Sequence, residues 1–237
     1  MDDKSSYVRR FWEDRGRRID DPVLAARFRA DDRLGYDLEL ARGFCSPNSR
    51  VLDLGAGTCE LSCHLSPDVR EVVAVDFVRE LLEKRTLPPN ITPVVADIRH
   101  FRSDDPFDVV LVYGVLNYVL DDADIRGVYR NVRDMLAPDG ICIIKHQSGV
   151  RETVTIDQYS EEFGTRYIAI YRQLEDEIRM LRDWFDVEVV DAYPAHLNRW
   201  DNTHFYAFVC RPKTVRRPGP ASVDEPEREH RLIEVGG

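Results

Sequence analysis

Short apolar runs alternate with stretches of helical spacing between Ser49 and Arg211, and this alternation leaves few folds open to the chain. Repeated strand–helix–strand units build a largely parallel sheet with helices on its faces. Little alternation within the first five runs indicates strands that helices cover on both sides. About ten residues without helical pattern join the last two runs, too few for a crossover helix, so these two strands are predicted to be antiparallel. The seven predicted strands span residues 50–54, 71–76, 91–96, 107–113, 140–147, 187–193 and 204–210.

The chain is predicted to hold one core domain, over residues 46–212, with a distinct segment on each side. Residues 1–45 mix arginines and aromatic residues at helical spacing, and we interpret them as a lid of one or two helices over the mouth of the sheet. Residues 213–237 are rich in Pro, Arg and Glu and nearly devoid of apolar side chains. Burial cannot offset the ordering entropy of such a segment, so we expect a disordered tail.

The segment between the fifth and sixth predicted strands has two parts. Residues 147–159 are polar and unpatterned, and we interpret them as a loop at the edge of the sheet where ligands bind. Apolar residues then recur at steps of three and four from Phe163 to Phe185. This spacing predicts one long amphipathic helix over residues 160–185.

Charge and cysteine content disfavour several classes of partner and ligand. The formal net charge of -10 repels the phosphate backbone of nucleic acids and anionic lipid surfaces, so we expect neither as a partner. No apolar run approaches the roughly 20 residues that cross a bilayer, and the expected location is the cytoplasm. Five scattered cysteines without a CxxC pair predict free thiols. Cys59, Cys63 and His64 lie one helical turn apart but lack further ligands, so no metal is expected.

A glycine pair follows the first predicted strand. Gly55 and Gly57 allow the backbone to turn tightly and to approach a ligand closely, although many strand-to-helix turns need glycine for steric reasons alone. Asp76 ends the second strand about 20 residues later, where a carboxylate can accept hydrogen bonds from both hydroxyls of a ribose. Glu60 replaces the third glycine of a dinucleotide fingerprint and disfavours a diphosphate there. An NAD-dependent oxidoreductase is therefore the weaker interpretation.

Five motifs in this order resemble those of the class I S-adenosylmethionine-dependent methyltransferases. The resemblance covers roughly residues 49–211 and implies a Rossmann-like α/β fold. In that fold a seven-stranded, mostly parallel sheet with an antiparallel final strand carries helices on both faces, here with an N-terminal helical lid. The motifs are Asp53-Leu54-Gly55-Ala56-Gly57-Thr58, Asp76, Ala96-Asp97-Ile98, Phe107-Asp108-Val109-Val110 and Leu136-Ala137-Pro138-Asp139-Gly140.

The resemblance also implies roles for individual residues in binding S-adenosylmethionine. The two glycines would pass under the methionine part, Asp53 would hold its ammonium group, and Asp76 would bind the ribose. Asp97 would accept a hydrogen bond from the adenine amino group, with the Ile98 amide near the ring and Phe77 against its face. Structural roles compete, since Asp53 could cap the next helix and Asp97 could be a turn residue. The implied cofactor residues are Asp53, Gly55, Gly57, Thr58, Asp76, Phe77, Asp97, Ile98 and Tyr113.

The methyl acceptor is expected at the carboxyl ends of the strands. A general base helps when the acceptor is a hydroxyl or a protonated amine, and His146 and His204 are the candidates, although either could be structural. Arginines near the N-terminus could meet an anionic group of the acceptor, but solvated helix charges explain them as well. The residues expected to bind the acceptor are Asn117, Tyr118, Tyr159 and Trp200.

We therefore predict a methyltransferase that acts on an oxygen or nitrogen atom of a small molecule. A sugar or another secondary metabolite is suggested by similarity at the level of the class alone. Two alternatives stay open. The chain could use S-adenosylmethionine for chemistry other than methylation, or it could be a noncatalytic subunit that binds the cofactor. The sequence does not indicate the oligomeric state.

Overall fold

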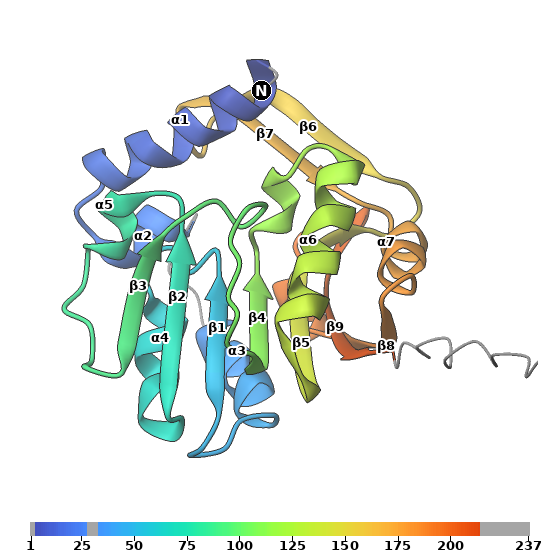
Figure 1. The fold of residues 1–237 in the computed structure, drawn as a ribbon. Helices are drawn as coiled ribbons and strands as arrows, with labels where there is room; N and C mark the ends of the chain where they lie inside the picture. The colour runs from blue at the N-terminus through green and yellow to red at the C-terminus, as the bar shows by residue number, and fades with distance from the viewer. Residues whose placement is uncertain (1–2, 28–32, 214–237) are drawn as a thin grey trace, which may run out of the picture.

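A seven-stranded sheet in the order β3-β2-β1-β4-β5-β9-β8 lies at the centre of the computed structural model, which describes residues 3–27 and 33–213 (Figure 1). Neighbouring strands from β3 to β5 are parallel, whereas β9 runs antiparallel to both β5 and β8. The predicted parallel sheet with an antiparallel final strand is thus confirmed. The strands are β1 (Arg50–Leu54), β2 (Glu71–Asp76), β3 (Ile91–Val95), β4 (Phe107–Tyr113), β5 (Leu136–Gly149), β8 (Phe185–Asp191) and β9 (Thr203–Pro212).

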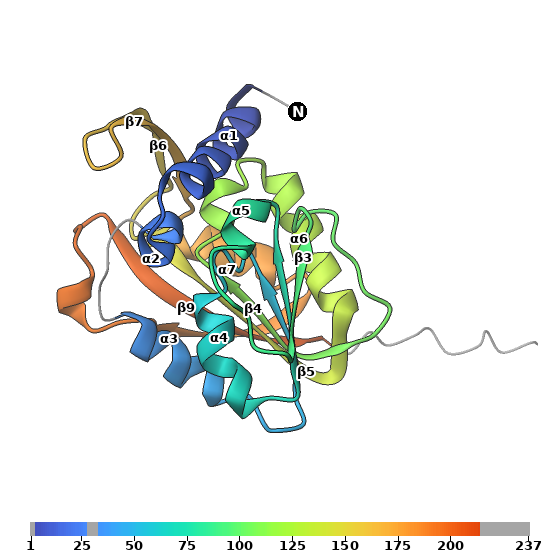
Figure 2. The same cartoon turned by 90° about the vertical axis from the view of Figure 1, so that its left-hand side faces the viewer.

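Both faces of the sheet are apolar because the strands are nearly continuous apolar runs and successive side chains of a strand point to opposite sides. Val51 and Ile143 belong to the cluster under α3 (Arg33–Arg42) and α4 (Glu60–Leu65). Leu52 and Ile144 belong to the cluster under α6 (Asp122–Met135) and α7 (Leu174–Leu181). Figure 2 shows α3 beside α4. Thus α3, which lies within the segment predicted as a lid, packs on a face of the sheet instead.

Residues 154–171 form a β-hairpin, which the sequence did not predict. β6 (Val154–Ser160) pairs antiparallel with β7 (Thr165–Tyr171), and α7 begins only at Leu174. The predicted helix over 160–185 is therefore wrong before residue 174 and after residue 181. The predicted loop over 147–159 is wrong because β5 and β6 occupy most of it. Gly164, at a φ of +62°, supplies the turn.

A second layer covers the carboxyl ends of the parallel strands. It consists of α1 (Asp3–Arg18), α2 (Pro22–Ala26) and the β6–β7 hairpin, and we call it the cap (Figure 1). Phe11 and Trp12 of α1 share an apolar cluster with Tyr167 and Ile168 of β7. Short α5 (Arg79–Leu82) contributes Leu81 to the same cluster.

The remaining elements are three turns of 3-10 helix, and they are η1 (Ser66–Asp68), η2 (Leu116–Tyr118) and η3 (Ala195–Leu197). None of the helices in the described ranges is long and apolar enough to cross a membrane. The division of the chain at residues 45 and 212 stays a prediction. The expected disordered tail lies, apart from Lys213, outside the described residues.

Candidate active site

A cavity of about 810 Å³ lies between the cap and the carboxyl ends of the strands. The β1–α4 turn, the ends of β2, β4 and β5, both hairpin strands and the β8–β9 loop all contribute side chains to its wall. Ligand sites of open α/β sheets lie at this edge. The cavity therefore lies where the sequence placed the ligand.

The β1–α4 turn brings the backbone to the cavity wall. Gly55 and Gly57 have φ angles of +80° and +54°, which residues with a side chain rarely adopt. A Cβ atom on Gly55 would lie 2.6 Å from the Cβ atom of Val115. The turn therefore requires glycine at position 55 for both conformation and space.

Two buried carboxylates flank this turn, and both line the cavity. Asp53 is 3% exposed, and its Oδ2 accepts a hydrogen bond of 2.6 Å from Ser62 Oγ. Asp76 is 7% exposed and accepts from the backbone amides of Gly57 and Val78, each at 2.9 Å. Burial raises the pKa of each carboxyl to about 6. Thr58, Phe77 and Tyr113 line the same cavity.

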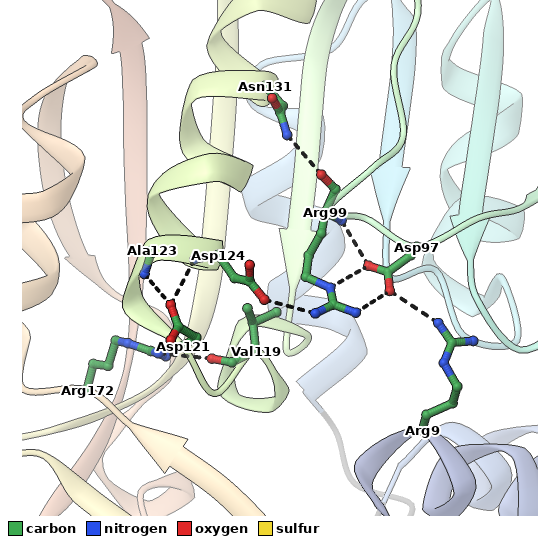
Figure 3. Close-up of polar contacts among 9 residues, drawn as sticks. All are labelled: Arg9, Asp97, Arg99, Val119, Asp121, Ala123, Asp124, Asn131 and Arg172. Carbon is green, nitrogen blue, oxygen red and sulfur yellow. Dashed lines mark hydrogen bonds and ion pairs between the residues drawn. The ribbon is translucent and has the colours of Figure 1, made fainter. Parts of the chain in front are cut away.

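Asp97 and Ile98 line a smaller cavity of about 50 Å³, whose wall shares Phe77 and Tyr118 with the larger one. Figure 3 shows Asp97 between two arginines. Arg99 donates to Oδ1 from its backbone amide and from Nε, both at 3.0 Å, and to Oδ2 from Nη2 at 2.7 Å. Arg9 of α1 donates to Oδ2 at 3.2 Å. Burial opposes ionisation of Asp97, but these bonds hold its pKa below the usual value.

All four residues predicted to bind the acceptor line the large cavity. Asn117 donates from Nδ2 to the carbonyl oxygens of Gln147 (2.8 Å) and Ile170 (2.9 Å), so it links η2 to β5 and to the hairpin. Tyr118 Oη lies 3.1 Å from Tyr167 Oη. Tyr159 and Trp200 are exposed apolar side chains on the hairpin and on the β8–β9 loop.

Sequence reasoning missed a buried polar cluster at the cavity wall. Lys145 Nζ donates to Asp37 Oδ1 and Oδ2 at 2.9 and 2.8 Å and to Tyr193 Oη at 2.6 Å. All three residues line the cavity. Burial lowers the pKa of Lys145, while Asp37 opposes that shift. A lysine within an apolar strand was the available signal, because a buried charge requires a partner.

Neither histidine proposed as a general base lines either of the two cavities described above. His146 is 2% exposed and lies on the opposite face of β5 from Lys145, with Nε2 3.7 Å from Glu177 Oε1 of α7. His204 Nε2 lies 2.9 Å from Asp191 Oδ1. Its neighbours Thr203 and Phe205 line the cavity instead, because side chains alternate along β9.

Comparisons with known proteins agree with this geometry. Residues 51–140 match the family model described as a methyltransferase domain. Nodulation protein S of Rhizobium tropici is 32% identical over 107 residues, which make up 44% of this chain and 44% of that protein. The matched segment thus spans less than half of this curated relative.

Two solved structures share the fold. The N-methyltransferase NodS of Bradyrhizobium japonicum WM9 in complex with S-adenosyl-l-homocysteine has a TM-score of 0.59 at 19% identity, covering 90% of this chain and all of that one. Phosphoethanolamine N-methyltransferase 1 of Haemonchus contortus, in complex with phosphoethanolamine and S-adenosylhomocysteine, has a TM-score of 0.69 at 20% identity. That match covers 90% of this chain and 50% of the other.

Proposed function

We propose that the chain is a class I S-adenosylmethionine-dependent methyltransferase and that it transfers a methyl group from S-adenosylmethionine to a nitrogen or oxygen atom of a small molecule. One observation carries the proposal. A single cavity joins the glycine turn and its two buried carboxylates to an aromatic chamber beneath the cap. Cofactor and acceptor can therefore meet within one cavity.

The residues at the turn fit the proposed cofactor. Three backbone amides, those of Gly57, Phe77 and Val78, favour the ionised form of Asp76, and a carboxylate has about four lone-pair sites. The buried carboxylate can therefore still accept a hydrogen bond from a ribose hydroxyl. Asp53 accepts at Oδ2, which leaves Oδ1 for the ammonium group of the methionine part, as no described residue donates to that atom. Gly55 and Gly57 allow that part to lie against the backbone.

The chain's contribution to chemistry is placement. S-adenosylmethionine, when bound, supplies a methyl group activated on a sulfonium. Holding the acceptor in line with that group provides much of the acceleration, with no residue acting as a nucleophile. Burial raises the pKa of Tyr118, Tyr167 and Tyr171, so these side chains stay neutral and can orient an acceptor by hydrogen bonds.

Two features support a small acceptor. The cap closes over the cavity from α1 and from the hairpin, and an 810 Å³ volume lies within the range of about 300–1,000 Å³ that is usual for small-molecule sites. The two structural neighbours named above are N-methyltransferases, which supports nitrogen rather than oxygen as the acceptor atom. We place the acceptor among Asn117, Tyr118, Tyr159 and Trp200.

Titration calorimetry with S-adenosylhomocysteine tests the cofactor site. The wild-type protein is expected to bind one equivalent. Asp76→Ala is expected to weaken binding about ten- to a hundredfold, because a hydrogen bond to a charged group contributes about 1.5–3 kcal/mol.

Asp186→Ala is the matched control, since this aspartate is exposed on β8 and lines neither cavity. It should bind as the wild type does. Equal affinity of the Asp76 variant would rule out the ribose assignment. Absence of binding to the wild-type protein would rule out the cofactor.

A further inference from the structure

The guanidinium group of Arg9 lies between Phe77 and Asp97, two of the three residues that the proposed cofactor site assigns to adenine. Its Cζ atom is 4.5 Å from the centre of the Phe77 ring. Its Nη2 atom is 3.2 Å from Asp97 Oδ2, as Figure 3 shows. The space left beside Phe77, Asp97 and Ile98 is about 50 Å³. We call the place bounded by these three residues the adenine seat.

Arg9 makes the contacts in this seat that an adenine would make. A guanidinium is planar, stacks on an aromatic face and donates N–H groups to a carboxylate. The adenine ring is also planar, and its amino group is the donor expected to meet Asp97. The two groups therefore compete for the same ring face and the same carboxylate oxygen.

The hydrogen bonds of Asp97 make this competition unavoidable. Oδ1 accepts from the backbone amide and the Nε atom of Arg99, and Oδ2 accepts from Arg99 Nη2 and Arg9 Nη2. Two donors at each oxygen use the full acceptor capacity of a carboxylate. One donor must leave before an adenine amino group can bind.

Arg9 is the donor that can leave. Arg99 holds Asp97 through three bonds and is itself fixed by Asp124 Oδ2 at 2.9 Å. Arg9 holds Asp97 through one bond, and a third of its side chain is exposed. Glu13, one turn later on α1, already lies 3.9 Å from Arg9 Nη1 and offers an alternative partner. The side chain can therefore turn away without a movement of the helix.

We propose that the Arg9 side chain fills the adenine seat of the cofactor-free protein and thereby lowers the affinity of the protein for its cofactor. The inference rests on the proposed function, since it assumes an adenine in this seat. The cofactor binds only to molecules in which Arg9 has left the seat, so the apparent affinity equals the intrinsic affinity multiplied by the fraction of such molecules. Arg9 is thus a determinant of affinity that opposes binding.

Calorimetric titration of S-adenosylhomocysteine into Arg9→Ala and Arg9→Gln tests the proposal. Both variants lack the competing ion pair, so both are expected to bind about three- to tenfold more tightly than the wild type. Arg10→Ala is the matched control, because Arg10 is exposed on the same helix and its loss changes the net charge equally. It should bind as the wild type does. High salt should narrow the difference between wild type and Arg9→Ala, since it weakens the ion pair.

The outcomes separate the two proposals. Unchanged or weaker binding by both Arg9 variants, with a normal Arg10 variant, would overturn the role of Arg9 while leaving the proposed function intact. A gain in affinity shared by the Arg10 variant would also overturn it, because the effect would then come from net charge alone. Absence of binding in every protein would overturn the proposed function and this inference with it.

Discussion

Asp53 and Asp76 are carboxylates that the fold holds out of water beside the glycine turn. Each has a pKa of about 6 because burial penalises the charged form more than the hydrogen bonds of Ser62, Gly57 and Val78 favour it. A cationic or hydroxyl-bearing ligand would stabilise the ionised forms. The unfavourable burial of these groups is thus consistent with a site built for a ligand rather than for stability.

The same two residues predict how affinity depends on pH. S-adenosylhomocysteine should bind the ionised carboxylates, so binding at a pH near 6 should release protons. Affinity should fall about tenfold or more between roughly pH 7.5 and pH 5. Calorimetry at several pH values, in buffers of different ionisation enthalpy, measures both effects. Affinity that does not change over this range would contradict the assignment of both carboxylates.

The stability of the folded protein depends on pH in the opposite direction to the affinity for the cofactor. The pKa of these groups is about 6 in the folded protein and about 4 in an unfolded chain. Their contribution therefore stabilises the cofactor-free protein at low pH and is lost as the pH rises through 6. Denaturation of the cofactor-free protein should show this contribution, and S-adenosylhomocysteine should reduce it.

Residue motifs predicted the glycine turn at the cavity but not the polar cluster of Lys145 and Asp37 in the cavity wall. Gly55 and Asp76 belong to short local patterns at strand ends, which a single sequence displays. Lys145 and Asp37 are separated by 108 positions and meet only because α3 packs beside β5. A pairing of this kind has no local pattern, so only the folded chain reveals it.

At the scale of elements, the β6–β7 hairpin shows that apolar residues at helical spacing can lie on a strand. Phe163, Tyr167, Ile170 and Leu174 have the spacing of a helix, yet the second and third lie on β7. Consecutive residues of β7, from Tyr167 to Ala169, are buried because the strand packs within the cap and lacks a solvent face. The alternation that identifies a strand is therefore missing. The aromatic and β-branched composition of residues 165–171, after Gly164, was the signal that favoured a strand.

His146 of β5 contacts the helices on one face of the sheet and lies away from the cavity. Glu177 of α7 accepts a hydrogen bond from Tyr129 of α6 and lies 3.7 Å from His146 Nε2. Although Glu177 is fully buried, the neighbouring His146 helps to hold its pKa below the usual value. These three side chains therefore couple three elements.

We predict that His146→Ala lowers the free energy of unfolding by about 2–5 kcal/mol, because it takes the imidazole away from a buried carboxylate and leaves Tyr129 as its hydrogen-bond donor. Affinity for S-adenosylhomocysteine should be unchanged. His204→Ala is the matched control and should cost at most about 1 kcal/mol, since His204 pairs with an exposed Asp191. Urea unfolding measures both.

The double variant His146→Ala, Glu177→Gln should recover part of the loss, because no charge is then left unpaired. Normal stability of His146→Ala together with lost methyl transfer would contradict a structural role and restore the histidine as a candidate base.

At the scale of the whole molecule, two segments far apart in sequence complete one site. Residues 3–27 and 154–171 form the cap, whereas the sheet and its turns supply the carboxylates. The mostly parallel sheet was predictable because each strand–helix–strand unit is local in sequence. The cap pairs Tyr7 with Arg166, whose carbonyl oxygen accepts from Tyr7 Oη at 3.0 Å. This arrangement explains why the acceptor chamber could not be outlined from the sequence.

Methyl transfer itself is the most direct test of the account. S-adenosylmethionine labelled in its methyl group should be incubated with the protein and a panel of small amines, sugars and other hydroxyl compounds. The account predicts that the label moves to a small acceptor, that one S-adenosylhomocysteine forms for each methyl group transferred, and that Asp76→Ala lowers the rate at limiting cofactor. Tight cofactor binding without transfer to any acceptor, or transfer of a different part of the cofactor, would contradict it.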